Sequence, residues 1–166
     1  MQKSVVEKEF VKKVTESQGI VHKVCRIYCD NEEDKKDLFQ EILIQLWKSY
    51  PSFRGDSKFS SWMYRVGLNV AISNLRKSKT KKEDSTLPDS FDSISKESDE
   101  QSLSLEKGLL RDAIQQLNKI EKGIMMLYLE EKPNEEIAEI MGITQNNVRV
   151  KMTRIRNKLK ETLKPS

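Results

Sequence analysis

Hydrophobic residues recur at three- and four-residue intervals toward both ends of the chain, which is the spacing of amphipathic α-helices. Over residues 5–28 the pattern predicts one helix, with an interruption at Gly19 that should bend or break it. A second helix is predicted after Asp30 and Asn31, because both side chains can cap a helix and acidic residues crowd the turn that follows. It should end before Pro51, since proline cannot continue a helix.

A third helix is predicted after the turn at Gly55 and Asp56, with Ser57 as its cap. Asn69 lies within one residue of the apolar stripe of this helix, so we expect its amide to be buried and hydrogen-bonded to the backbone or inside a polar pocket. The predicted stripe consists of Phe59, Trp62, Met63, Val66 and Val70.

Helical periodicity is lost between residues 81 and 104, which are rich in serine and acidic side chains. Such a composition cannot bury enough apolar surface to offset the entropy lost on ordering, so we expect a flexible acidic linker. The predicted fold is all-α, with a helical bundle over 1–80 and a second small helical domain over 105–166.

Residues 134–160 have the layout of a helix-turn-helix. Ala138 is small enough for the point where two helices cross, and Gly142 suits a tight turn that requires a positive φ angle. Thr144 can cap the second helix. The buried side of that helix should carry residues at spacings of four, three and four, namely Val148, Met152, Ile155 and Leu159.

The opposite face of this helix presents amides, a hydroxyl and cations, which are the side chains that read a DNA major groove. Arginine bonds guanine in a bidentate manner, asparagine and glutamine bond adenine, and cations reach the phosphates. The predicted DNA-facing residues are Gln145, Asn146, Arg149, Thr153, Arg154 and Arg156. The alternative is a solvated basic face on an ordinary helical hairpin.

In the first domain, aromatic residues lie close in sequence to cations, a combination by which proteins hold unpaired bases. The aromatic residues are Phe53, Phe59, Trp62 and Tyr64, and the cations are Arg54, Lys58, Arg65, Arg76 and Lys77. Core packing is the competing interpretation for Phe59, Trp62 and Met63, because these three also fall on the apolar stripe.

The overall composition argues against some classes of function. Charged residues make up 34% of the 166 residues and hydrophobic ones 36%, which leaves too little apolar material for a large interior with a deep catalytic pocket. The net charge is only +4, but basic residues gather at 76–82 and 149–160 around an acidic middle. This segregation favours a polyanionic partner. With one histidine and no glycine-rich phosphate loop, we predict no enzyme and no cofactor.

His22, Cys25 and Cys29 share one predicted helix face, and this spacing could present three ligands to zinc. No convincing fourth ligand lies near, and helical cysteine is most often a small core residue, so we predict no metal and no disulfide. The chain shows no secretory signal and no run of 18 uncharged apolar residues. We therefore expect a cytoplasmic protein in a reducing compartment, without membrane insertion.

Residues 37–77 resemble region two of the extracytoplasmic-function (ECF) sigma factors of bacterial RNA polymerase, and residues 118–160 resemble their region four. The motifs that carry the resemblance are DLFQE, FRGDSKFSSWMYRVGLN, EEIAEIMGIT and NVRVKMTRIR, in the family's order with a short acidic linker between the regions. The resemblance implies a sigma factor that directs core polymerase to specific promoters and assists DNA opening.

The resemblance also implies roles for residues of the first domain. One helix would dock on the coiled coil of the polymerase's largest subunit through Asp37, Gln40, Glu41, Ile44 and Trp47. The following loop and helix would capture a flipped base of the −10 element and its phosphates through Phe53, Arg54, Lys58, Trp62, Arg65, Asn69, Arg76 and Lys77.

In the second domain, the resemblance implies that Arg149, Thr153 and Arg154 read the −35 element as duplex, with Val150 where a small polar residue can stand in relatives. The implied partners are promoter DNA and core RNA polymerase, the latter also through its flap region. Members of the family are held inactive by anti-sigma factors, some of them membrane-bound, and we expect such a partner here.

Two rival functions make different predictions. A helix-turn-helix repressor or activator would bind a palindrome without polymerase, and a pure interaction protein would bind no DNA. A flexible linker of about 25 residues has a mean span of roughly 25 to 30 Å and can stretch to about 80 Å. Promoter elements a turn and a half apart are separated by about 50 Å, so the linker can reach this distance but would not hold it unaided. We therefore expect the polymerase to fix the separation of the two domains, and the free protein to bind promoter DNA poorly.

Overall fold

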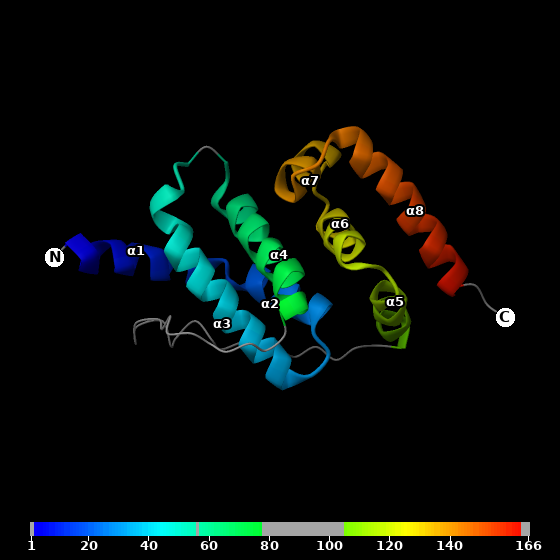
Figure 1. Ribbon diagram of the computed structural model, residues 1–166, viewed down its shortest axis with the longest axis horizontal. Helices are drawn as coiled ribbons and strands as arrows, with labels where there is room; N and C mark the ends of the chain where they lie inside the picture. The colour runs from blue at the N-terminus through cyan, green and yellow to red at the C-terminus, as the bar shows by residue number, and fades with distance from the viewer. Residues whose placement is uncertain (1, 56, 78–104, 164–166) are drawn as a thin grey trace. The chain divides into compact units, whose positions relative to one another are not determined.

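The computed structural model describes residues 2–55, 57–77 and 105–163, and every regular element in these ranges is a helix (Figure 1). The chain divides into two compact units, Met1–Ser98 and Asp99–Ser166. The predicted all-α class is confirmed. The segment predicted as an acidic linker, 81–104, lies outside the described residues.

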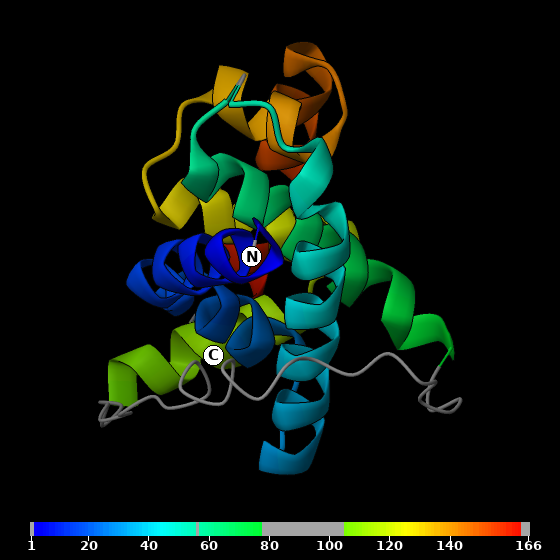
Figure 2. The same cartoon turned by 90° about the vertical axis from the view of Figure 1, so that its left-hand side faces the viewer.

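The first unit is built around three helices that contact one another, α2, α3 and α4. Figures 1 and 2 show α3 and α4 as a hairpin with α2 beside them, and α1 leads into α2. The elements are α1 Gln2–Glu16, α2 Gln18–Tyr28, α3 Glu32–Ser49, a short 3-10 turn Tyr50–Ser52 and α4 Phe59–Lys77.

The predicted break in the first helix occurs, but at Ser17 rather than at Gly19, which lies inside α2. The Ser17 amide donates to the Val14 carbonyl, and the Ile20 amide donates to the Ser17 carbonyl, each at 3.0 Å. These bonds span three residues instead of four, so the chain tightens for one turn before the helix resumes.

The ends of α3 follow the prediction. Asn31, rather than Asp30, is the cap, because the Asp34 amide donates to Asn31 Oδ1 at 2.7 Å. The helix ends at Ser49, two residues before Pro51. The next helix, α4, begins at Phe59, so Lys58 and not the predicted Ser57 immediately precedes it.

The buried face of α4 differs from the predicted stripe. In the part of α4 whose side chains are described, the buried residues are Ser61, Met63, Tyr64, Gly67, Leu68 and Ala71. Of the predicted stripe, Met63 is buried as expected, whereas Phe59, Trp62, Val66 and Val70 are only half-buried. The prediction of a buried Asn69 was wrong, because this residue is exposed. A Cβ atom at Gly67 would lie 3.7 Å from both Ile42 and Val24. Gly67 and Ala71 therefore let α4 lie close to α2 and α3, and four of the predicted stripe residues lie at the edge of this contact rather than inside it.

The second unit contains the predicted helix-turn-helix in α7 and α8, packed on α6. Gly142 has φ +73°, and the Asn147 amide donates to Thr144 Oγ1 at 3.0 Å, so the turn and the cap are confirmed. Its helices within the described residues 105–163 are α5 Leu105–Gln115, α6 Lys119–Leu129, α7 Asn134–Met141 and α8 Gln145–Leu163.

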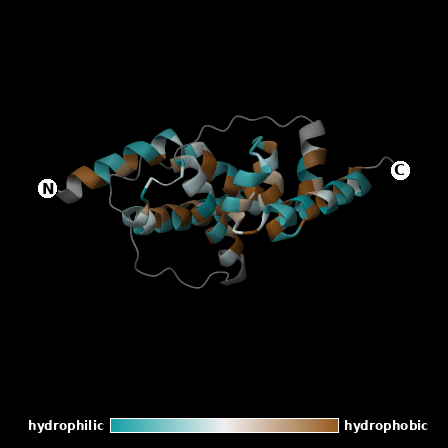
Figure 3. Ribbon diagram, turned by 90° about the horizontal axis from the view of Figure 1, so that it is seen from above, coloured by the Kyte–Doolittle hydropathy of each residue, from teal (hydrophilic) through white to brown (hydrophobic). Residues whose placement is uncertain are grey.

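The predicted stripe of α8 is confirmed at Val148, Met152 and Ile155, which are buried, while Leu159 is half-buried. Hydrophilic and hydrophobic residues alternate in bands along this helix (Figure 3). One side of α8 is thus committed to the core, and the other side is left to solvent.

Gly67→Ala should stabilise the first unit by about 0.5 to 1 kcal/mol, because alanine favours the helix and its methyl group would make ordinary van der Waals contact with Ile42 and Val24. Urea unfolding followed by tryptophan fluorescence measures this, since both tryptophans, Trp47 and Trp62, lie in the first unit.

Gly19→Ala is the matched control, because a Cβ atom there has nothing within 4 Å and only helix propensity changes. Gly67→Leu should destabilise the unit by overpacking. A loss of stability in Gly67→Ala, with a gain in Gly19→Ala, would contradict the packing described.

Candidate nucleic-acid interfaces

The outer face of α8 presents every residue predicted to contact duplex DNA. All seven are exposed, and they lie outside the stripe of Val148, Met152 and Ile155. The Thr153 hydroxyl donates to the Arg149 carbonyl at 3.2 Å, which leaves its methyl group and an acceptor lone pair for other contacts. The exposed residues are Gln145, Asn146, Arg149, Val150, Thr153, Arg154 and Arg156.

Two contacts from α6 fix the C-terminal half of α8. At the start of α6, Glu121 Oε1 lies 2.7 Å from Lys158 Nζ. Near the end of α6, the Arg156 guanidinium lies over the ring of Tyr128, 5.6 Å from its centroid. Contacts of Lys158 and Arg156 with α6 therefore hold α8 in place.

Glu121 is also half of a capping box with Asn118, because each side chain accepts a hydrogen bond from the other residue's amide. Burial alone would raise the pKa of the Glu121 carboxyl. Hydrogen bonds from Lys158 and the Asn118 amide, with the charges of Lys158 and Lys151, outweigh burial and hold that pKa below its ordinary value. The spacing of Asn118 and Glu121 is a known helix-start signature, and it could have been recognised in the sequence.

In the first unit, one face of α4 brings together three of the predicted strand-binding residues. Trp62, Arg65 and Asn69 follow one another at spacings of three and four, which places them on the same side of the helix. Arg65 and Asn69 are exposed, and Trp62 is half-buried. The backbones of Arg76 and Lys77 lie in the last turn of α4, and their side chains lie outside the described residues.

The loop before α4 completes an aromatic cluster centred on Phe53. The Phe53 ring centroid lies 5.1 Å from Trp62, 5.5 Å from Phe59 and 6.5 Å from Tyr50. Tyr64, which the sequence grouped with these residues, is buried in the core and only 2% exposed. Tyr50 takes its place in the cluster, while the predicted cations Arg54 and Lys58 are exposed nearby in the same loop.

Helix α1 adds a cation to this cluster that the sequence did not indicate. Lys13 Nζ lies 5.5 Å from the Phe59 centroid and 5.9 Å from the Tyr50 centroid, and 3.8 Å from Glu9. Burial raises the pKa of the Tyr50 hydroxyl, and a hydrogen bond to Glu9 and the charge of Glu9 raise it further. About forty residues separate Lys13 from the loop, so only the fold brings them together.

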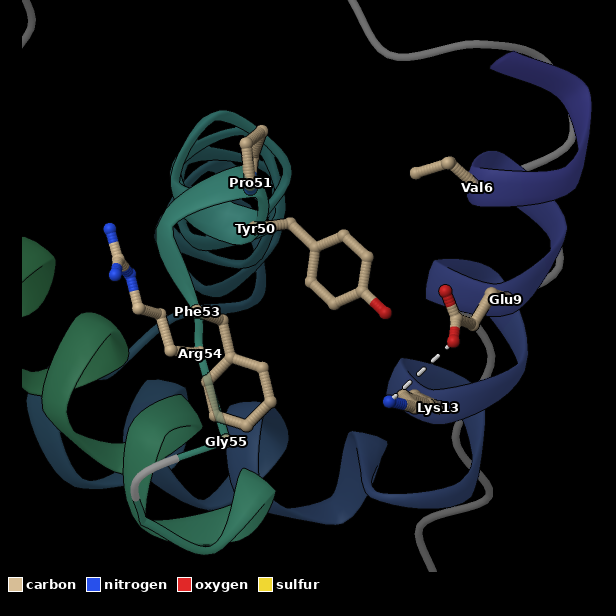
Figure 4. Close-up of a pocket in the computed structure, with 8 residues that line it drawn as sticks. All are labelled: Val6, Glu9, Lys13, Tyr50, Pro51, Phe53, Arg54 and Gly55. Carbon is tan, nitrogen blue, oxygen red and sulfur yellow. Dashed lines mark ion pairs between the residues drawn. The ribbon is translucent and has the colours of Figure 1, made fainter. Parts of the chain in front are cut away.

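These side chains border an open cavity of about 560 Å³ between α1 and the loop (Figure 4). Its walls combine aromatic rings with cations and one carboxylate. The residues that line it are Val6, Glu9, Lys13, Tyr50, Pro51, Phe53, Arg54 and Gly55.

A further polar face lies on α3, on the side away from the core. Asp37, Gln40, Glu41 and Ile44 recur at helical spacing, the first two exposed and the others half-buried. Trp47, predicted on the same surface, is half-buried and meets the Phe10 ring of α1 edge-on at 5.0 Å. The structure therefore joins four of these five residues in one open surface and places Trp47 at its border with α1.

His22 and Cys25 of α2, and Cys29 directly after it, pack in the core or at its edge. The His22 ring stacks on Phe39 at 4.6 Å, and Cys25 and Cys29 are buried and not joined in a disulfide. Burial, followed by the charges of Asp34 and Asp30, raises the pKa of the Cys29 thiol to about 11, which disfavours the thiolate that metals bind. Among the described residues, no three histidine, cysteine or acidic side chains are grouped to hold a metal ion.

None of the helices that the structure describes is both long and apolar enough to span a bilayer.

Comparison with known proteins gives a consistent result for both units. Residues 14–81 match the sigma-70 region 2 family, and residues 107–159 match the sigma-70 region 4 family. The chain is 26% identical to the ECF RNA polymerase sigma factor SigW of Bacillus subtilis over 87% of this chain and 83% of that protein. It is 27% identical to the ECF sigma-E factor of Escherichia coli over 80% and 75% of the two chains.

Two solved structures have a similar fold. One is the sigma factor RpoE in complex with the anti-sigma factor NepR from Bartonella quintana, with TM-score 0.70 and 20% identity over 95% of this chain and 98% of that one. The other is CnrH in complex with the cytosolic domain of CnrY, with TM-score 0.66 and 18% identity over 94% and 88%.

The ion pair between Glu121 and Lys158 should make the second unit sensitive to acid. Because the carboxyl pKa is lowered by folding, Glu121 stabilises the unit above the ordinary carboxyl pKa of about 4.3. That stabilisation is lost as the pH falls through the lowered pKa of the folded state. Glu121→Gln keeps a capping oxygen but loses the charge, so at pH 7 amide exchange in α6 and α8 should be about two- to fivefold faster.

Hydrogen-exchange mass spectrometry, corrected for intrinsic rates, measures this effect in peptides from the two helices. Glu161→Gln is the control, because it removes an exposed carboxylate from the same helix α8. Equal exchange in both variants would contradict a stabilising role for the ion pair.

Proposed function

Since the chain belongs to the sigma-70 family, as an ECF sigma factor for promoter-specific initiation of transcription, we propose that its two units bind separate promoter elements while core RNA polymerase holds both. The domain over 1–80 docks on the polymerase and binds the opened −10 element. The domain over 105–166 reads the −35 element, and 81–104 connects the two. The chain works in the cytoplasm, where its polymerase and DNA lie, and catalyses no reaction itself.

The exposed face of α8 is the observation that carries this proposal. A major groove about 12 Å wide admits one helix, and the capped start of α8 lets its first turns enter. There Arg149 suits guanine and Asn146 suits adenine, while the exposed Val150 offers an apolar contact to a thymine methyl group. Arg154 and Arg156 lie farther along, where cations meet phosphates.

The aromatic cluster is suited to unpaired DNA. Phe53 and Trp62 are half-buried, so each has part of its ring available to a base while the core fixes its position. The exposed amide of Asn69 lies on the Trp62 side of α4 and can bond the edge of that base. The strand's phosphates meet the cations of the loop and of α4, namely Arg54, Lys58, Arg65, Arg76 and Lys77, with Lys13 contributed by α1.

The polymerase-binding surface is the outer side of α3, with Asp37, Gln40 and Glu41 as its polar contacts and Ile44 as its apolar one. It faces the coiled coil of the largest subunit, while the second domain binds the flap region. An anti-sigma factor, soluble or membrane-bound, covers the same surfaces when the chain is inactive. RpoE and CnrH, whose folds are similar, are each seen in complex with a second protein.

Run-off transcription with core polymerase tests both surfaces in one experiment. The promoter is first selected by the wild-type holoenzyme from a randomised library. Arg149→Ala should lower initiation about five- to 150-fold and relax base preference at one −35 position, since it removes a bidentate contact. Phe53→Ala should lower open-complex formation in a similar range, since one stacked base is lost.

The two defects should separate on different templates. Phe53→Ala should leave binding to the −35 duplex intact, and Arg149→Ala should leave binding to a forked −10 template nearly intact. Asn157→Ala, an exposed change on the same face of α8 but beyond the base-reading turns, is the control. Normal promoter selection by the Arg149→Ala holoenzyme would refute the −35 assignment.

A further inference from the structure

Lys158 and Arg156 of α8 both contact α6, but they contact side chains of different charge. Lys158 is neutralised by the carboxylate of Glu121, whose side chain is only 8% exposed. Arg156 instead lies over the neutral ring of Tyr128, so its guanidinium keeps its full positive charge. The same helix therefore neutralises one cation and holds the other ready for an external anion.

The position of Arg156 indicates what that anion is. Arg156 follows Arg149 by seven residues, which is two helical turns, so both lie on the same side of α8 about 10 Å apart along the axis. The major groove is about 12 Å wide. When Arg149 reaches a base inside the groove, Arg156 lies at its edge, where the phosphates run.

The contact with Tyr128 leaves the guanidinium able to bind such a phosphate. The ring of Tyr128 neutralises no charge, and a guanidinium carries five N–H donors, so donors remain for a phosphate. Tyr128 is 43% exposed, so it does not serve to fill the core. Its contact with Arg156 therefore lies at the surface, where DNA can reach the guanidinium. An arginine held in one orientation loses less rotamer freedom when it binds, and this raises affinity.

We propose that Tyr128 is a positioning residue that holds Arg156 in place for a DNA phosphate at the edge of the −35 element. This inference rests on the proposed role of α8. Because Tyr128 acts only through Arg156, it contributes to affinity equally for all sequences and not to base preference.

A double-mutant cycle in the holoenzyme tests the proposal. Binding to a duplex with the selected −35 sequence is measured over a range of salt concentrations, with core polymerase saturated by each variant. Tyr128→Leu should weaken binding about two- to fivefold, the effect of one exposed cation–π contact. Tyr128→Phe keeps the ring and should bind like wild type.

The salt dependence separates positioning from direct contact. Arg156→Ala should reduce the slope of log affinity against log salt by about one, because a phosphate contact is lost. Tyr128→Leu should leave the slope unchanged, because the phosphate contact still forms. In the Arg156→Ala background, Tyr128→Leu should have no further effect.

Three results would overturn the proposal. The first is an equal effect of Tyr128→Leu with and without Arg156, and the second is a Tyr128→Phe defect as large as that of Tyr128→Leu. The third is an Arg156→Ala variant with unchanged affinity and salt slope. If Arg149→Ala still weakens binding in that case, only the role of Arg156 fails and the −35 assignment stands. If Arg149→Ala also has no effect, the proposed function of α8 itself fails.

Discussion

The packing of α8 against α6 and α7 is the contact on which the proposed DNA-reading surface depends. Burial of Val148, Met152 and Ile155 fixes how the helix is rotated, and rotation decides which side chains reach solvent. In a unit of this size the core is small, so polar contacts at its border matter more than in a large domain. Glu121 and Tyr128 supply them at two points on α6.

In the first unit, too, the packing of one helix decides which of its side chains reach solvent. Gly67 and Ala71 let α4 approach α2 and α3, and together with Met63 and Leu68 they form its buried side. Trp62 is only half-buried and Asn69 is exposed, so both remain at the surface. The proposed base-binding side chains are therefore not needed to fill the core.

Local signals in the sequence predicted much of this structure. The cap at Asn31, the turn at Gly142 and the stripe of α8 each follow from a few neighbouring residues. The first two are confirmed, and the stripe is confirmed at Val148, Met152 and Ile155 but not at Leu159, which is only half-buried. On α4 only Met63 of the predicted stripe is buried, because periodicity weighs large apolar residues more than glycine and alanine. The contacts of Lys13 with the loop and of Lys158 with Glu121 join residues far apart in sequence, so no local pattern could reveal them.

In the function proposed here, two small, separate surfaces recognise a promoter only when core polymerase holds them at the right spacing. The decisive measurement is the affinity and selectivity of the purified chain for its promoter, with and without core polymerase. We expect weak and unselective binding by the chain alone and tight, selective binding by the holoenzyme. Binding that is equally tight and selective without polymerase would show that the two surfaces need no such support.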